Sequence, residues 1–132
     1  MIRFALPAIG LSLMAAPAAA TEWTICASKG GEASFSVLVG SLGIGTANEF
    51  KVEQGGKMWS TTTGEGTPIV RGQSFEDDNT ILIDVRTDDM GAVVAELRVF
   101  KAREGDEPTA MGGTLRMPGV GAWSVACDGG EG

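Results

Sequence analysis

"WTICASKGG" (23–31) and "WSVACDGG" (123–130) lie near the two ends of the chain and contain its only cysteines, Cys26 and Cys127. About a hundred residues separate the two cysteines, so they do not form a CxxC redox motif. The chain has no histidine, and two cysteines alone do not supply the ligands of a structural zinc site. We therefore predict a disulfide that joins the first and last strands of one domain.

Residues 1–20 have the features of a signal peptide. Arg3 is followed by an apolar stretch over 4–14, and three alanines end the segment at Ala20. Cleavage after Ala20 predicts an exported protein, periplasmic or secreted, and cysteines usually pair in such compartments. No later stretch of the sequence is long and apolar enough to predict a membrane span.

Residues 21–127 predict a single all-β domain, and 128–132 are expected to form a disordered tail. Turn residues recur every eight to twelve positions or so, and the segments between them alternate apolar and polar side chains. The residues expected to face the core include Phe35, Val37, Val39, Phe50, Val52, Ile81, Ile83 and Val85. The pattern predicts about eight strands in mostly sequential antiparallel order, as a small barrel or a two-sheet sandwich.

Two segments depart from simple strand alternation. Residues 92–101 fit a helix through Val94 and Phe100, but their β-branched content and hairpin context favour a strand with Leu97 and Val99 inside. The glycine pair in "TAMGGTLRM" (109–117) predicts a strand with a β-bulge.

The spacing of the cysteines raises a question of phase. In a regular strand Trp123 and Cys127 share a face, whereas Trp23 and Cys26 lie on opposite faces. If both tryptophans are core residues, the strand must be irregular at one cysteine. Adjacent first and last strands would also favour a closed barrel over an open sandwich.

The composition excludes several classes of function. Without histidine there is no Ser-His-Asp or Cys-His site, and we expect neither a metal nor a cofactor. The net charge of −7 disfavours nucleic acids and anionic membranes as partners and is compatible with a basic protein partner. Acidic groups such as "EDDNT" (76–80) lack the spacing of a calcium loop and indicate turns instead.

Candidate contact residues lie in two places. The loop "GSLGIG" (40–45) offers Leu42 and Ile44, which we expect to be exposed and available to a partner. The second group follows a tryptophan and comprises Trp59, Ser60, Thr61 and Thr62. With Trp23 and Trp123, Trp59 could line a pocket for a small molecule or a sugar.

In general form the chain resembles the small periplasmic inhibitors of c-type lysozyme, which are exported acidic β-domains with comparably placed cysteines. Those inhibitors carry an S-G-x-x-Y loop, which this tyrosine-free chain lacks; "STTTGEG" (60–66) is only a distant counterpart. The resemblance therefore assigns no site residues.

Three functions follow as hypotheses. The first is a non-enzymatic, inhibitor-like module that binds a basic periplasmic or extracellular protein through loops at one end of the domain. The second is a barrel that binds a small molecule in a tryptophan-lined pocket. The third is a hydrolase that uses Asp84 with a second carboxylate.

Overall fold

The structure is a computed structural model that describes residues 21–128. The signal peptide predicted at 1–20 and residues 129–132 of the predicted tail lie outside the described residues. The strands are β1 (Glu22–Ser28), β2 (Ala33–Val39), β3 (Phe50–Gln54), β4 (Lys57–Ser60), β5 (Thr67–Glu76), β6 (Thr80–Thr87), β7 (Val93–Ala102), β8 (Ala110–Met117) and β9 (Gly121–Asp128). A short 3₁₀ helix, η1 (Ile44–Thr46), lies between β2 and β3. No helix in residues 21–128 has the length and hydropathy needed to cross a membrane.

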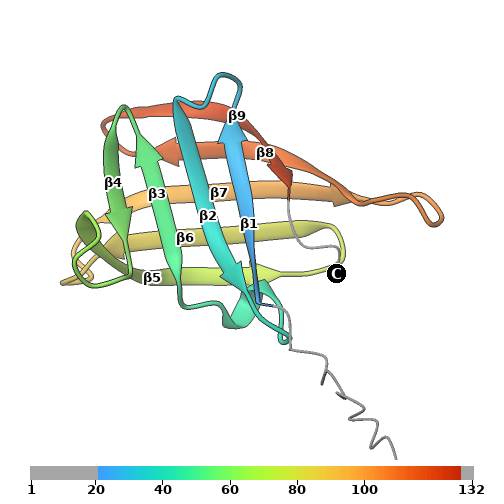
Figure 1. The fold of residues 1–132 in the computed structure, drawn as a ribbon, viewed down its shortest axis with the longest axis horizontal. Helices are drawn as coiled ribbons and strands as arrows, with labels where there is room; N and C mark the ends of the chain where they lie inside the picture. The colour runs from blue at the N-terminus through green and yellow to red at the C-terminus, as the bar shows by residue number, and fades with distance from the viewer. Residues whose placement is uncertain (1–20, 129–132) are drawn as a thin grey trace, which may run out of the picture.

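The strands form a closed barrel in chain order, with β9 paired to β1. The all-β prediction and the adjacency of the first and last strands are confirmed; the fold is a barrel of nine strands, where the sequence predicted about eight. One junction departs from the antiparallel pattern, because β4 runs parallel to β5 over two residue pairs. At this corner the chain passes from β1–β4 to β5–β8, and the two groups of strands cross each other (Figure 1).

The core consists of the inward-facing side chains of this barrel. Alternation places Phe35 and Phe50 inside, where their rings pack edge to face with centroids 6.1 Å apart. Residues 92–101 contribute to β7 as a strand, with Leu97 and Val99 buried and Phe100 exposed on the outer face. The barrel interior is therefore filled by side chains, as in other small barrels.

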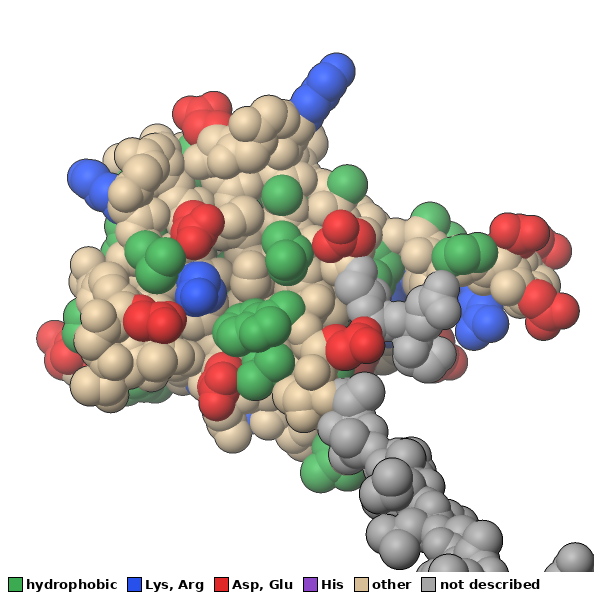
Figure 2. Space-filling model, in the orientation of Figure 1, with side chains coloured by type: hydrophobic (Ala, Val, Ile, Leu, Met, Phe, Trp, Pro, Cys, Tyr) green, Lys and Arg blue, Asp and Glu red, His purple; other side chains and the backbone are tan. Residues whose placement is uncertain are grey.

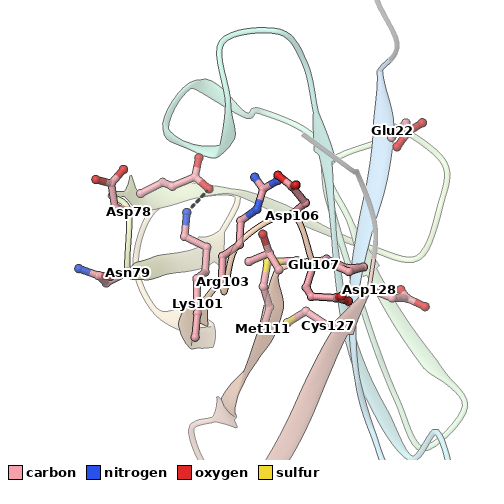
Figure 3. Close-up of a pocket in the computed structure, with 14 residues that line it drawn as sticks. Glu22, Asp78, Asn79, Lys101, Arg103, Asp106, Glu107, Met111, Cys127 and Asp128 are labelled. Atoms are coloured by element: carbon pink, nitrogen blue, oxygen red, sulfur yellow. Dashed lines mark hydrogen bonds and ion pairs between the residues drawn. The ribbon is translucent and has the colours of Figure 1, made fainter.

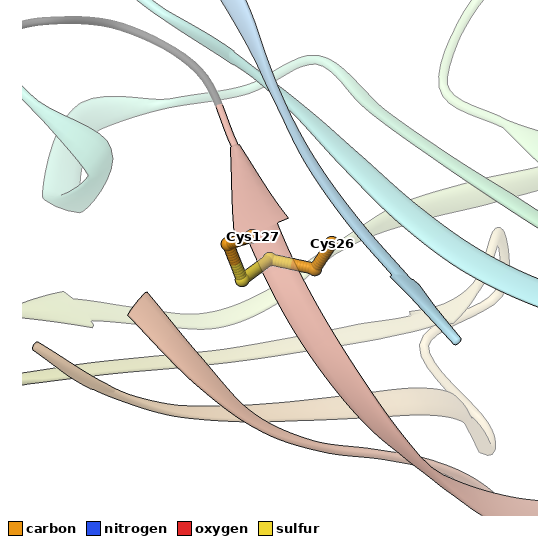
Figure 4. Close-up of a disulfide and its surroundings, with 2 residues drawn as sticks. All are labelled: Cys26 and Cys127. Carbon is orange, nitrogen blue, oxygen red and sulfur yellow. A yellow bond between two sulfur atoms is a disulfide. The ribbon is translucent and has the colours of Figure 1, made fainter. Parts of the chain in front are cut away.

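The disulfide between Cys26 and Cys127 is confirmed, and it needs no irregular strand (Figure 4). The two cysteines are direct partners in the β1–β9 ladder, and Cys26 is buried together with Thr24 on the same face of β1. The expectation of an irregular strand end is wrong because Trp23 is not a core residue: its side chain lies on the outer face, 39% exposed. The two cysteines are paired, and the distance from tryptophan to cysteine is three residues in β1 and four in β9. The two tryptophans therefore lie on opposite faces, with Trp23 outside and Trp123 against the core.

The glycine pair of β8 has a different role from the predicted bulge. β8 keeps an unbroken register with both β7 and β9, and the ladder irregularities lie instead in β5–β6 and β6–β7. Gly113 is required because a Cβ atom there would overlap the backbone of Arg98 on β7. At the other end, β9 extends to Asp128, which pairs with Ile25, so the strand includes the first residue of the predicted tail.

Reduction of the disulfide should destabilise the protein strongly. The bond closes a loop of 101 residues, and the chain-entropy relation gives about 4–5 kcal/mol for a loop of this size. Urea unfolding of oxidised and reduced protein should show a loss of this order in the free energy of unfolding. Alkylation of both cysteines in intact, non-reduced protein would contradict the assignment.

Replacement of Gly113 by alanine should also destabilise the barrel. The added methyl group would overlap the backbone of β7, so β7 and β8 must move apart to accommodate it. We expect the free energy of unfolding to fall by about 1–3 kcal/mol. Gly40→Ala is the matched control, because a Cβ atom at Gly40 meets no atom within 4 Å. Equal unfolding midpoints for the two variants in urea would show that β8 is not closely packed at Gly113.

Candidate functional site at the mouth of the barrel

A cleft of about 1300 Å³ lies at the mouth of the barrel (Figure 3). Part of its lining comes from side chains near the ends of strands. These side chains face inward and lie beyond the last buried core residue of their strand. Lys101 follows Val99 on β7, and Cys127 follows Val125 on β9. The turns over 77–79 and 103–109 rim the cleft, so it lies at one loop end of the domain.

The mouth is strongly acidic. Two cationic side chains, Lys101 and Arg103, face six carboxylates: Glu22, Glu76, Asp78, Asp106, Glu107 and Asp128. Within residues 21–128 only Glu76 of these carboxylates forms an ion pair, with Lys101 at 3.0 Å. The β7–β8 hairpin projects from the barrel and carries acidic side chains at its tip (Figures 1 and 2). A negative potential therefore faces solvent at this end.

The ion pair of Glu76 also fixes the loop beneath the mouth. Glu76 accepts a hydrogen bond from the Lys101 ammonium through Oε2, and one from the backbone N–H of Ile44 through Oε1 at 3.2 Å. Ser74 on the same strand donates to the Ile44 carbonyl at 2.7 Å. These bonds hold η1 against β5 and seat the Ile44 side chain in the core, where it is 4% exposed.

The two candidate residues of the glycine loop separate in the structure. Leu42 is 80% exposed, as predicted, and it lines a second, shallower depression with Leu38 and Glu49. The expectation that Ile44 is exposed is wrong, because η1 turns its side chain into the barrel. Of the two candidate residues, Leu42 alone is available to a partner.

The hydroxyl run after Trp59 stabilises the β4–β5 corner. Thr61 Oγ1 accepts from the N–H of Phe50 at 3.0 Å and donates to the Phe50 carbonyl at 3.3 Å. Ser60 is buried, and its hydroxyl accepts from the N–H of Thr62, whose own side chain is exposed. The Ser60 and Thr61 hydroxyls are therefore engaged with the backbone.

The three tryptophans do not line a common pocket. Trp59 and Trp123 are half-buried against the core, whereas Trp23 lies on the outer surface. Neither the mouth nor the shallower depression, both formed by residues within 21–128, includes a tryptophan. This arrangement offers no support for the tryptophan-lined pocket.

Asp84 lies outside both depressions. It is opposite Glu96 in the β6–β7 ladder, so two carboxylates are neighbours on the outer face. Each has its own arginine, because Arg98 binds Asp84 at 2.7 Å and Arg116 binds Glu96 at 3.0 Å. The two carboxylates and two arginines therefore alternate on the sheet surface. A hydrolase of this kind needs one protonated carboxyl as the acid and one free carboxylate as the nucleophile, and this arrangement supplies neither.

Asp77 at the rim supports the interpretation of "EDDNT" as a turn. Its Oδ1 atom accepts hydrogen bonds from the Thr80 hydroxyl and from the N–H groups of Asn79 and Thr80, at 2.7–2.8 Å. The Thr80 hydroxyl, followed by the two backbone donors, lowers the pKa of Asp77 below its ordinary value of 3.8. The carboxylate is thus used to hold the turn between β5 and β6.

Sequence reasoning missed most residues of the mouth. Lys101 and Met111 occupy inward-facing positions where the alternating pattern predicts core residues, and Glu22 shares the inward phase of Thr24 and Cys26. A charged residue at an inward-facing position near the end of a strand is the sequence signal that could have located the mouth of the barrel.

Comparisons of the chain with protein-family models, with curated proteins and with solved structures find no match. Within the described residues, no group of three or more Cys, Asp and Glu side chains is arranged to hold a metal ion.

The pKa of Asp77 provides a direct check of the rim. In Thr80→Val the largest of the stabilising hydrogen bonds is lost, so the pKa of Asp77 should rise towards 3.8. Because the folded pKa is depressed, this carboxylate stabilises the fold above pH 3.8 and loses that effect as the pH falls through the folded value. Carboxyl NMR titration of both proteins measures the change. Asp89, whose pKa is lowered mainly by Thr87, is the internal control and should not move.

Proposed function

We propose that the protein is an exported, non-enzymatic module that binds a basic partner protein at the mouth of the barrel. The observation that carries this proposal is the charge of the mouth, where five carboxylates have no ion-pair partner within residues 21–128. The disulfide and the signal-peptide pattern in the sequence support export.

The mouth suits a protein partner better than a small apolar ligand. Below it the barrel is filled by Phe35, Phe50 and their neighbours, and Ile44 is packed into the core beside them. The cleft is wide and polar, and its carboxylates come from the β5–β6 hairpin, from the β7–β8 hairpin and from the paired strands β1 and β9. Lysine and arginine side chains from a folded partner can reach these carboxylates, and opposite charge accelerates such an encounter.

The glutamates and aspartates at the mouth do not need to act as catalysts in this proposal. Glu76 is already neutralised by Lys101, and its second oxygen holds the backbone of Ile44. The remaining acids are separate surface charges that contribute to the potential of the mouth as a group.

Charge reversal at the rim should remove the partner. In Asp106→Lys/Glu107→Lys the β7–β8 hairpin becomes basic, so we expect binding at least about tenfold weaker. Immobilised protein and an extract of the producing cells provide the assay, with captured proteins identified by mass spectrometry and then purified for titration. Glu32→Lys/Asp88→Lys is the matched control, with the same change in net charge at exposed turns on the opposite end of the barrel.

The control separates a specific site from general charge attraction. A basic protein retained by the wild type and by the control, lost from the rim variant and released by rising salt supports the proposal. Equal retention by both double variants would contradict it.

A further inference from the structure

The outer face of β1 and β2 carries an exposed apolar patch beside the mouth. Trp23 is 39% exposed and Ile25 41% exposed, and Trp23 lies directly opposite the half-buried Leu38 in the β1–β2 ladder. We name these three residues the Trp23 face. In Figure 2 hydrophobic side chains gather over β1 and β2 at the centre of the view, with acidic side chains around them. Outward-facing strand positions on water-soluble sheets are ordinarily polar, so an exposed tryptophan here needs an explanation.

The charges around the Trp23 face are predominantly negative. Asp128 is opposite Ile25 on β9, and Glu49 adjoins Leu38, whose backbone N–H donates to the Glu49 carbonyl. The neighbouring cation, Lys51, lies over the Trp23 ring at 5.6 Å from its centroid, and Glu65 neutralises it at 3.5 Å. The surface therefore combines an apolar centre with an acidic rim.

We infer that the Trp23 face is a docking surface for the basic partner, and that it contacts an apolar or aromatic side chain flanked by lysine or arginine. This inference rests on the proposed function. Charge complementarity selects the occupant, because a second copy of this chain would bring the same carboxylates, Glu49 and Asp128, against each other.

The Trp23 face is continuous with the mouth. Asp128 lines the cleft and is also paired with Ile25 of the patch, so a single partner surface can cover both. The mouth then supplies long-range attraction, and the Trp23 face supplies a desolvated anchor of the kind that dominates binding energy in protein interfaces. The Lys51 side chain over the indole ring restrains Trp23 before the partner arrives, which reduces the entropy lost on binding.

Two peptides of equal charge test this inference on the purified protein. Lys-Phe-Lys-Lys-Phe-Lys combines cations with aromatic side chains, whereas Lys-Ser-Lys-Lys-Ser-Lys supplies the cations alone. In calorimetric titrations at low salt we expect the wild type to bind the phenylalanine peptide about tenfold more tightly, since a phenylalanine side chain becomes buried.

The variants locate the source of that preference. Trp23→Ser and, independently, Ile25→Ser should bring the phenylalanine peptide to the affinity of the serine peptide. Phe100→Ser is the matched control: it removes an exposed aromatic side chain, 71% exposed, from the outer face of β7 and should leave the preference intact. Urea unfolding midpoints establish that each variant is folded before the titrations are compared.

The outcomes distinguish the inference from the proposed function. A preference that survives both Trp23→Ser and Ile25→Ser, or that disappears in Phe100→Ser, overturns the inference. Self-association of the wild type that Trp23→Ser abolishes in sedimentation also overturns it and assigns the face to a second copy. The proposed function fails separately if Asp106→Lys/Glu107→Lys binds both peptides as tightly as the wild type. Failure of the wild type to bind either peptide overturns both proposals.

Discussion

The pairing of β1 with β9 is the constraint on which the rest of the structure depends. It brings Cys26 opposite Cys127 and converts a row of hairpins into a closed barrel. Closure gives the strands a common interior, which side chains from all nine strands and η1 fill. Closure also positions the mouth and the Trp23 face, because the mouth needs Glu22 and Asp128 from the two joined strands, and the Trp23 face lies beside the same seam.

The division between inside and outside was predictable from the sequence wherever strands alternate regularly. Phe35, Phe50, Ile83 and Val85 read as core residues from a period of two, and they are buried. The glycine pair at Gly55 and Gly56 likewise predicts a tight turn, and both residues adopt positive φ. These features are local, so they need no knowledge of which strands become neighbours.

The predictions that failed concern contacts between distant segments. The irregular strand end is predicted only if both tryptophans are core residues, yet the phase of Trp23 is set by the disulfide partner of Cys26 on β9. Gly113 suggested a bulge, but the cause of the glycine is the backbone of β7. Ile44 was expected to be exposed because its loop is rich in glycine, and hydrogen bonds from β5 turn it inward. The mouth escaped prediction for the same reason, because its residues come from five strands and two turns.

The seam between β1 and β9 also has a consequence for the order of assembly. Among the nine described strands β1 is synthesised first, but one of its two ladders needs β9, which is synthesised after the other eight. Hairpins such as β6–β7 can form while the chain is still emerging, whereas closure waits for pairing across almost the whole domain, and such non-local contacts slow folding. Until then one edge of β1, with Trp23 and Ile25 on its outer side, is unpaired. The interval between synthesis and closure is therefore the period in which the chain is most exposed to aggregation.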